Sequence, residues 1–365
     1  MVTRVRWAAV AMVLVASVTM AADGPKRVRK EAPQRPFMLP GDILRRLRQS
    51  PVELRISGIE NLQDVARGRL ADETWKQMVQ PIEYPKVKHL NGLITLEPWP
   101  RPRAVEAPMA KAEDAFQKQN YPEAAVWYRR TLEVAPDFYI AHAYLGDTHL
   151  FGDVGPREAI TEYDQAIAAN PDDYRLYFFR ATAHRHLFEN EEMLADLRRS
   201  LVLKPRNAIL IGALQRARGT MGHAEAEVFV PRAFVRKEGD AVSIYADTER
   251  PEWLAWAACK ALWMVDEQHR QEMLGSTRHG WSTLEELECL GSLMTVYETR
   301  KVKGQGPSDD RLEVLHDIII DGLAPAFVIY ELGSRVDPQI VLRLDGPFRE
   351  MMARYVEKYV LTPTE

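Results

Sequence analysis

The sequence predicts a mainly α-helical protein: a stack of three helical hairpins plus a C-terminal α-helical domain, with a small β-hairpin between them. Pro136, Pro171 and Pro205 recur 35 and then 34 residues apart. A period of this length is typical of helical hairpins that must stack to bury their apolar faces. Two further observations complete the prediction. Glu238-Gly239-Asp240 lies between short β-prone stretches, and helical periodicity resumes at Pro251.

The composition is that of an ordinary globular protein. The 365 residues are 46% hydrophobic and 27% charged, which is enough for two or three compact units with their own cores. The formal net charge of −4 provides no electrostatic attraction for a polyanion. We therefore expect no nucleic-acid partner.

The N-terminus has the pattern of an export signal. Arg4 and Arg6 precede the apolar stretch Trp7–Val18, and small residues then allow cleavage after Ala21. The stretch is shorter than the about 20 residues that span a bilayer. We expect residues 1–21 to be removed, leaving no stable membrane span and an extracytoplasmic protein, periplasmic or secreted. A retained anchor is the alternative.

Two further segments precede the repeats. Residues 22–40 are rich in proline, lysine and arginine, which favours a disordered leader; contact with an anionic surface is the alternative. Residues 41–104 predict short helices and a Pro-rich linker. Within them, Ser57-Gly58-Ile59-Glu60 has the pattern of a capping box that opens a helix, and Leu93–Leu96 resembles a short strand.

The repeats occupy roughly residues 105–223, including a helix over about 207–221 that caps the stack. Each unit has small residues where its two helices approach, larger residues that fill the gap to the next hairpin, and a closing proline. The first unit has Ala112, Ala124, Tyr128, Thr131 and Pro136; the second Leu145-Gly146, Ala159, Tyr163, Ala166 and Pro171; the third Ala181, Met193, Leu197, Ser200 and Pro205.

This pattern resembles the tetratricopeptide repeat family over about 100 of the 365 residues. The resemblance implies a concave groove, lined by the first helix of each hairpin, that binds a protein or peptide partner. The groove positions are Glu106, Met109, Glu113, Phe116 and Gln117 in the first unit, Ile140, Ala143, Asp147, Leu150 and Phe151 in the second, and Arg175, Phe178, Thr182, Arg185 and His186 in the third.

The groove positions predict a charge gradient, acidic in the first unit and basic in the third, around four large apolar side chains: Phe116, Leu150, Phe151 and Phe178. A peptide would bind with its basic end toward the first unit. Some family members clamp a C-terminal carboxylate with lysine and asparagine; Met109 and Glu113 stand at those first-unit positions, so we expect no such clamp. The alternative is that the N-terminal segment or the C-terminal helices fill the groove.

A β-hairpin connector is expected over residues 224–250, with Val228–Val230 and Val242–Tyr245 as its strands. The C-terminal helical domain then covers residues 251–365, and its family is not recognisable from the sequence. Its expected helices are Pro251–Leu274, Thr283–Val302, Asp310–Gly333 (kinked or divided at Pro325) and Pro338–Val360.

Tryptophans are concentrated in this domain: Trp253, Trp256 and Trp263 share one stripe and Trp281 follows. We expect them in the core; a stacking platform for a sugar or peptide is the alternative. The two cysteines, Cys259 and Cys289, would be staggered by more than about 10 Å in a simple antiparallel hairpin. That separation is too large for a disulfide, so we expect two free, buried thiols.

The expected function is that of an exported adaptor or scaffold that binds a protein or peptide in its groove. None of the motifs H-E-x-x-H, paired C-x-x-C or G-x-S-x-G is present, so we assign no catalytic residue, metal site or cofactor. The alternative is an enzyme with a site in the C-terminal domain, where Asp317, Asp321 and Glu331 lie on an apolar stretch.

Overall fold

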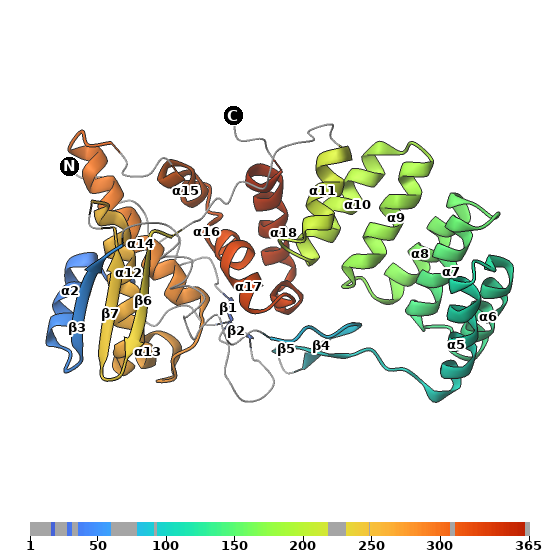
Figure 1. Ribbon diagram of the computed structural model, residues 1–365, viewed down its shortest axis with the longest axis horizontal. Coiled ribbons are helices and arrows are strands. Elements are labelled where there is room, and N and C mark those ends of the chain that lie inside the picture. Colours follow the sequence, from blue (N-terminus) through green and yellow to red (C-terminus); the bar gives the residue numbers. More distant parts are fainter. Residues whose placement is uncertain are drawn as a thin grey trace.

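The computed structural model of the protein is mainly α-helical, as predicted. Figure 1 shows a small sheet with α2 and α12–α14 at one end, α15–α18 in the middle, and the hairpin stack α5–α11 at the other end. Among the described residues, no helix is long and apolar enough to cross a bilayer. The description covers residues 16–18, 28–30, 36–59, 79–90, 93–217, 231–247, 249–306 and 311–361.

Seven helices form the hairpin stack. The second helix of each hairpin ends two residues before one of the periodic prolines, because the residue before a proline is disfavoured in helical conformation. The helices are α5 (Arg103–Gln117), α6 (Tyr121–Val134), α7 (Tyr139–Phe151), α8 (Pro156–Ala169), α9 (Tyr174–His186), α10 (Asn190–Leu203) and α11 (Ala208–Ala217).

Small residues bring the paired helices together as the sequence pattern requires. Ala112, Ala124, Ala159 and Ala166 are buried, and a Cβ atom at Gly146 would lie 2.6 Å from the Tyr163 ring. α7 and α8 therefore approach more closely than an alanine would allow. The three hairpins with their capping helix confirm the predicted tetratricopeptide-like stack.

A three-stranded sheet lies beside α12. Its strands are β3 (Glu53–Gly58), β6 (Ala233–Glu238) and β7 (Ala241–Ala246), in the order β3-β7-β6. β6 and β7 form the predicted antiparallel hairpin, although Val228–Val230, expected as its first strand, lies outside the described residues. β3 adds to β7 in parallel. Ser57 and Gly58 end β3, because β7 offers Glu53–Gly58 a complete ladder of backbone partners. The helix that Ser57 was expected to open lies outside the described residues.

Short strands also occur in the segments expected to be linkers. β4 (Pro85–Leu90) pairs antiparallel with β5 (Leu93–Pro98), so the predicted strand at residues 93–96 is confirmed. β1 (Ala16–Val18) pairs antiparallel with β2 (Val28–Lys30). The rest of the predicted export signal and most of the predicted leader lie outside the described residues.

In the C-terminal region, the predicted helix at residues 283–302 is confirmed. Each of the other three predicted helices is broken into shorter ones. The first divides at Asp266, the third at Gly322 (φ +73°). The elements are α12 (Pro251–Val265), α13 (Glu267–Leu274), α14 (Thr283–Val302), α15 (Arg311–Ile320), α16 (Ala324–Phe327), η1 (Val328–Gly333), α17 (Ser334–Val336), η2 (Ile340–Arg343), α18 (Gly346–Tyr355) and η3 (Val356–Val360); α2 (Pro40–Gln49) packs against α12.

The two cysteines are free and buried, as expected, but the expected stagger was wrong. Burial raises the pKa of Cys259 to about 11, and an interaction with the thiol of Cys289 opposes that rise. The two thiols therefore lie near each other. The stagger disappears because the break at Asp266 turns α13 into part of the connection: Cys259 then stands as far before the end of α12 as Cys289 stands after the start of α14.

One core joins the C-terminal helices, the sheet, α2 and the third hairpin. Trp253, Trp256, Trp263 and Trp281 are all buried in it, which confirms the expectation that they are core residues. The first two hairpins have a second core of their own. The boundary expected between repeats and C-terminal domain is thus crossed by continuous apolar packing.

Candidate functional site

The concave face of the stack contains two adjoining hollows that share Asp147. The first, which we call the acidic hollow, has a volume of about 440 Å³ and is lined by Glu83, Tyr84, Arg101, Glu113, Phe116, Gln117, Tyr128, Tyr144 and Asp147. The second, the apolar hollow, has a volume of about 630 Å³ and is lined by Asp147, Leu150, Phe151, Phe178, Phe179, Ala181, Thr182, Arg185, Asn190, Met193, Leu197, Ala213, Arg216 and Ala217.

Nine of the fifteen predicted groove residues line these hollows: Glu113, Phe116, Gln117, Asp147, Leu150, Phe151, Phe178, Thr182 and Arg185. They come from the first helices of the three hairpins, α5, α7 and α9, so the helical phase transferred from the sequence pattern brings them to one face. These nine residues therefore lie at the surface of the hollows.

The other six predicted residues do not line either hollow. Met109, Ile140 and Ala143 are buried in the core of the first two hairpins. Glu106 and His186 are exposed outside the hollows. None of these five residues lies on the surface of a hollow, because three side chains pack in the core between helices and two face solvent elsewhere.

The sixth of these residues, Arg175, is in contact with other parts of the protein. Its guanidinium pairs with Asp173 at 2.6 Å and donates to the main-chain oxygen of Glu83 at 2.7 Å. It also lies 4.4 Å above the Tyr84 ring. These contacts use the Nε and one terminal nitrogen of the guanidinium and place its plane against a ring, so Arg175 holds the chain's own N-terminal segment.

That segment, residues 82–90 and 93–101, is called the wrap segment below. The hydroxyls of Tyr84 and Tyr144 share a hydrogen bond of 2.9 Å. Asn170 donates to the main-chain oxygen of Pro85 at 3.1 Å, and Trp99 packs edge-on against Tyr139 at 4.7 Å. The alternative that the N-terminal segment fills the groove is therefore correct for the part beside Tyr144 and Arg175, and the apolar hollow is left open.

Asp147 lies where the hollows meet. Burial raises the pKa of its carboxyl to about 7, and a hydrogen bond from the Tyr163 hydroxyl, 2.6 Å long, opposes that rise. A carboxyl that titrates near neutral pH is costly to keep charged in an apolar setting. It is therefore suited to pair with a donor or a cation on a bound ligand.

Aromatic side chains line the path between the hollows. The rings of Phe116 and Phe151 meet edge to face with centroids 6.5 Å apart, and Phe151 is 56% exposed. Phe151 offers an apolar contact surface to a partner.

Sequence reasoning missed the contributions of α11 and of the wrap segment. Arg216 follows Thr182 by 34 residues, as Thr182 follows Asp147 by 35 and Asp147 follows Glu113 by 34. Extending the period by one unit into the capping helix would have identified it. The wrap-segment residues Glu83 and Tyr84 carry no such signal, because they come from outside the repeat.

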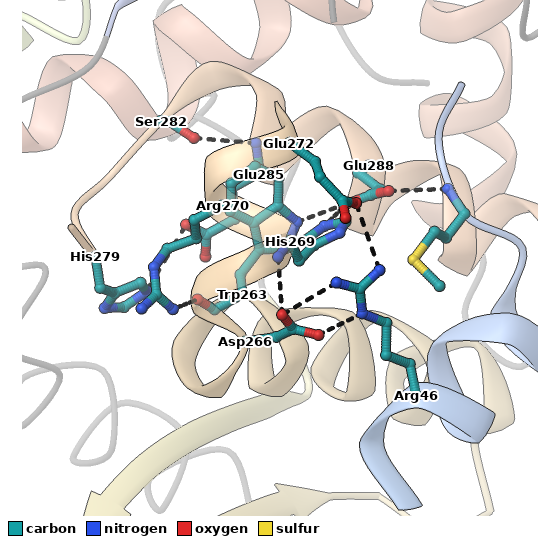
Figure 2. Close-up of polar contacts among 11 residues, drawn as sticks. Arg46, Trp263, Asp266, His269, Arg270, Glu272, His279, Ser282, Glu285 and Glu288 are labelled. Carbon is teal, nitrogen blue, oxygen red and sulfur yellow. Dashed lines mark hydrogen bonds and ion pairs between the residues drawn. The ribbon is translucent and has the colours of Figure 1, made fainter. Parts of the chain in front are cut away.

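A second polar cluster lies in the C-terminal core (Figure 2). Glu288 and His269 are fully buried. The Glu288 carboxylate accepts hydrogen bonds from the ring nitrogens of His269 and Trp263, both at 2.7 Å, and from the main-chain nitrogen of Met38 at 2.8 Å. Arg46 of α2 pairs with Asp266 and with Glu272. The cluster therefore fastens the N-terminal segment to the helices.

Other charges in this core also join helices. Burial lowers the pKa of Lys260, but the carboxylates of Glu285 and Glu286, at 2.6 and 2.7 Å, hold it well above its ordinary value. Arg270 donates to the main-chain oxygens of Trp263 and Met264 and so caps the end of α12. Each of these groups has a partner that explains its burial.

The carboxylates named for a hidden enzyme site do not converge. Glu331 is buried and bonded to Arg206 and Tyr355. Asp321 pairs with Lys358, and Asp317 is exposed. Among the residues that the structure describes, no group of three or more His, Cys, Asp or Glu side chains is placed to hold a metal ion.

No family model and no curated protein matches the sequence. Solved structures match the repeat region. The first tetratricopeptide domain of Spaghetti (RPAP3), bound to the HSP90 peptide SRMEEVD, is 20% identical, with 33% of this chain and 95% of that chain covered and a TM-score of 0.31. The Arabidopsis OM64 tetratricopeptide domain is 22% identical, with 32% and 97% covered and a TM-score of 0.31.

The Sgt2 tetratricopeptide domain from Aspergillus fumigatus is 12% identical, with 34% of this chain and 85% of that chain covered and a TM-score of 0.31. The chain's own helix lengths, proline spacing and small-residue contacts define the class: a protein with a tetratricopeptide-like hairpin stack and an open concave hollow.

Proposed function

We propose that the protein is an adaptor or scaffold that binds an extended segment of a partner protein in the apolar hollow. The observation that carries this proposal is the hollow itself: about 630 Å³ on the concave face, with Phe151 56% exposed at its edge. A cavity of this size accommodates several side chains. A hydrophobic centre with a polar edge is the usual composition of a protein-binding surface.

The wrap segment supports a peptide rather than a small molecule as the ligand. Arg175 and Asn170 hold this segment through the main-chain oxygens of Glu83 and Pro85. The same concave face therefore already binds extended chain by backbone contacts. The apolar hollow continues that face beyond Asp147, which lines both hollows.

The test is a selection of peptides from a random displayed library on the full-length protein. The affinities of the selected peptides are then measured by fluorescence anisotropy. The double variant Phe151→Ala/Phe178→Ala removes the two rings and should weaken binding by about tenfold or more. The matched control is Phe188→Ala, because Phe188 is 86% exposed on the loop after α9 but does not line the hollow.

Thermal melting followed by circular dichroism checks that each variant is folded. Selected peptides that bound the double variant as tightly as the wild type would refute the proposal. Equal losses in Phe188→Ala and in the double variant would also refute it, because the effect would then not belong to the hollow.

We further propose that the adaptor works outside the cytoplasm, as a periplasmic or secreted protein. Support comes from the basic residues Arg4 and Arg6, the apolar stretch after them and the small residues before Ala22. The expected mature N-terminus is Ala22. Mass spectrometry of the protein from cell fractions of its host tests this: a cytoplasmic protein that retained residues 1–21 would contradict it.

A further inference from the structure

Charge is unevenly distributed along the two hollows. Among the described residues, the acidic hollow is lined by the carboxylates of Glu83 and Glu113, the carboxyl of Asp147 and one cation, Arg101, which lies 3.9 Å from Glu113. The described lining of the apolar hollow has the cations Arg185 and Arg216, and the shared Asp147 is its one carboxyl group. The groove is therefore negative at the end near α5 and positive at the end near α11.

The two arginines at the positive end of the groove are available to a ligand. Arg185 and Arg216 are exposed, and within the described part of the chain neither makes an ion pair or a side-chain hydrogen bond. Two other arginines of the concave side are engaged: Arg175 by Asp173 and by Glu83, and Arg101 by Glu113. Two unpaired guanidinium groups beside an apolar hollow favour a carboxylate, which they can bind in bidentate geometry.

The direction of the gradient follows from the repeat. Glu113, Asp147, Thr182 and Arg216 occupy the same position in successive units, so one helical phase changes from acidic through neutral to basic along the stack. A ligand whose own charges run the opposite way gains attraction at both ends, whereas a ligand of uniform charge is repelled at one end.

We propose, on the basis of the groove function above, that the ligand is a zwitterionic peptide segment with one large apolar side chain. The apolar side chain occupies the hollow between Leu150 and Phe178. A carboxylate, from an acidic side chain or from the peptide C-terminus, binds Arg185 and Arg216. A lysine or arginine of the same segment lies at the carboxylates of Glu113 and Glu83.

The experiment uses synthetic fluorescein-labelled probes and the full-length protein. The parent probe carries the fluorescein on its N-terminal amine and has the sequence Lys-Gly-Gly-Phe-Gly-Glu with an amidated C-terminus. Three variants carry Gln for Glu, Gln for Lys, or a Gln at the end with a free C-terminal carboxylate. The last one distinguishes a side-chain carboxylate from a terminal one.

At low salt the parent probe should bind about five- to tenfold more tightly than either Gln variant, and this advantage should shrink at high salt. The double variant Arg185→Glu/Arg216→Glu should reverse the preference for the C-terminal residue of the probe. A probe with Lys in place of this Glu should then bind better than the parent. The matched control is Arg354→Glu, an exposed arginine of α18 outside both hollows.

The two proposals can fail separately. If all probes lose affinity in Phe151→Ala/Phe178→Ala but the charge preference is unchanged in Arg185→Glu/Arg216→Glu, the groove binds peptides and the ligand class is wrong. The inference is also wrong if the wild type prefers the uncharged or uniformly charged probes. If the parent probe binds equally well to both groove variants, both proposals are overturned.

Discussion

The position of a groove residue was predictable where the phase of its helix determines it. It was unpredictable where a distant segment of the chain covers the residue. Phe178 and Thr182 line the hollow because α9 continues the phase of α7. The same phase predicted Arg175 as a groove residue, yet its guanidinium contacts the main-chain oxygen of Glu83 and the ring of Tyr84. Their approach depends on the path of the wrap segment, which no local pattern in residues 82–101 reveals.

Asp147 leads to a prediction at this scale. Folding raises its pKa from an ordinary 3.8 to about 7 because the carboxyl is buried. The folded protein therefore keeps a proton that the unfolded chain releases between these pH values, and the stability from this group is present at low pH and is lost as pH rises through 7. Asp147→Asn removes the titration and should gain stability over the wild type as pH rises from 4 to 8, by at most about 4 kcal/mol.

Urea unfolding of both proteins at several pH values between 4 and 8 measures this difference. Asparagine keeps an oxygen that can accept from the Tyr163 hydroxyl, so the packing is little changed. The matched control is Asp153→Asn, at an exposed position in the loop after α7. A stability difference between Asp147→Asn and wild type that stayed constant across this range would contradict the prediction.

Among the secondary-structure elements, the repeat helices were predictable because period, proline and small residues all indicate the same hairpins. β3 was not, since its partner β7 lies almost 190 residues away and pairs with it in parallel. The same reasoning explains the cysteines: a single N-cap at Asp266, whose carboxylate accepts from the His269 main-chain nitrogen, divides a helix that periodicity alone treats as continuous. Long-range pairing and one cap outweighed local propensity.

α2 provides a prediction at the scale of an element. Its apolar residues Ile43 and Leu47 are buried, and Arg46 fastens it to Asp266 and Glu272. Arg46→Ala leaves these carboxylates without that cation and should destabilise the docked helix by about 1–3 kcal/mol. Hydrogen exchange of Pro40–Gln49 should become faster by about one to two orders of magnitude.

Arg45→Ala is the matched control, because Arg45 precedes Arg46 on the same helix and, among the described residues, pairs only with Asp42, 2.8 Å away, in an exposed ion pair. Its removal should change the exchange of α2 little. Exchange in α2 that responded equally to both substitutions would show that the polar cluster of Figure 2 does not hold the helix.

At the scale of the whole molecule, the sequence separates a repeat region from a C-terminal domain, whereas the structure joins them. Arg349 pairs with Asp172 at 2.5 Å, and Gln339 exchanges two hydrogen bonds with the main chain of Ile82. The wrap segment is thus bonded to the C-terminal helices on one side and to the repeats on the other. This arrangement fixes the position of the acidic hollow relative to the rest of the protein.

The last prediction follows from the ion pair between Arg206, just after the third hairpin, and Glu331 of η1, whose atoms are 2.5 Å apart. Glu331 is 4% exposed and also accepts from Tyr355. Arg206→Met leaves this carboxylate buried without the cation and should cost about 3 kcal/mol. Because one core spans both regions, hydrogen exchange of α12 and hydrogen exchange of α9–α11 should report the same loss.

Arg198→Met is the matched control, since Arg198 pairs with Glu357 at 2.9 Å in a more exposed position and its loss should cost about 1 kcal/mol or less. Hydrogen exchange measured in both sets of helices separates the outcomes. If Arg206→Met accelerated exchange in α12 and left exchange in α9–α11 unchanged, the third hairpin would unfold independently of the C-terminal helices. Faster exchange in both sets means instead that the hollow is held open by the whole molecule, since Met193 and Leu197 of its lining belong to the shared core.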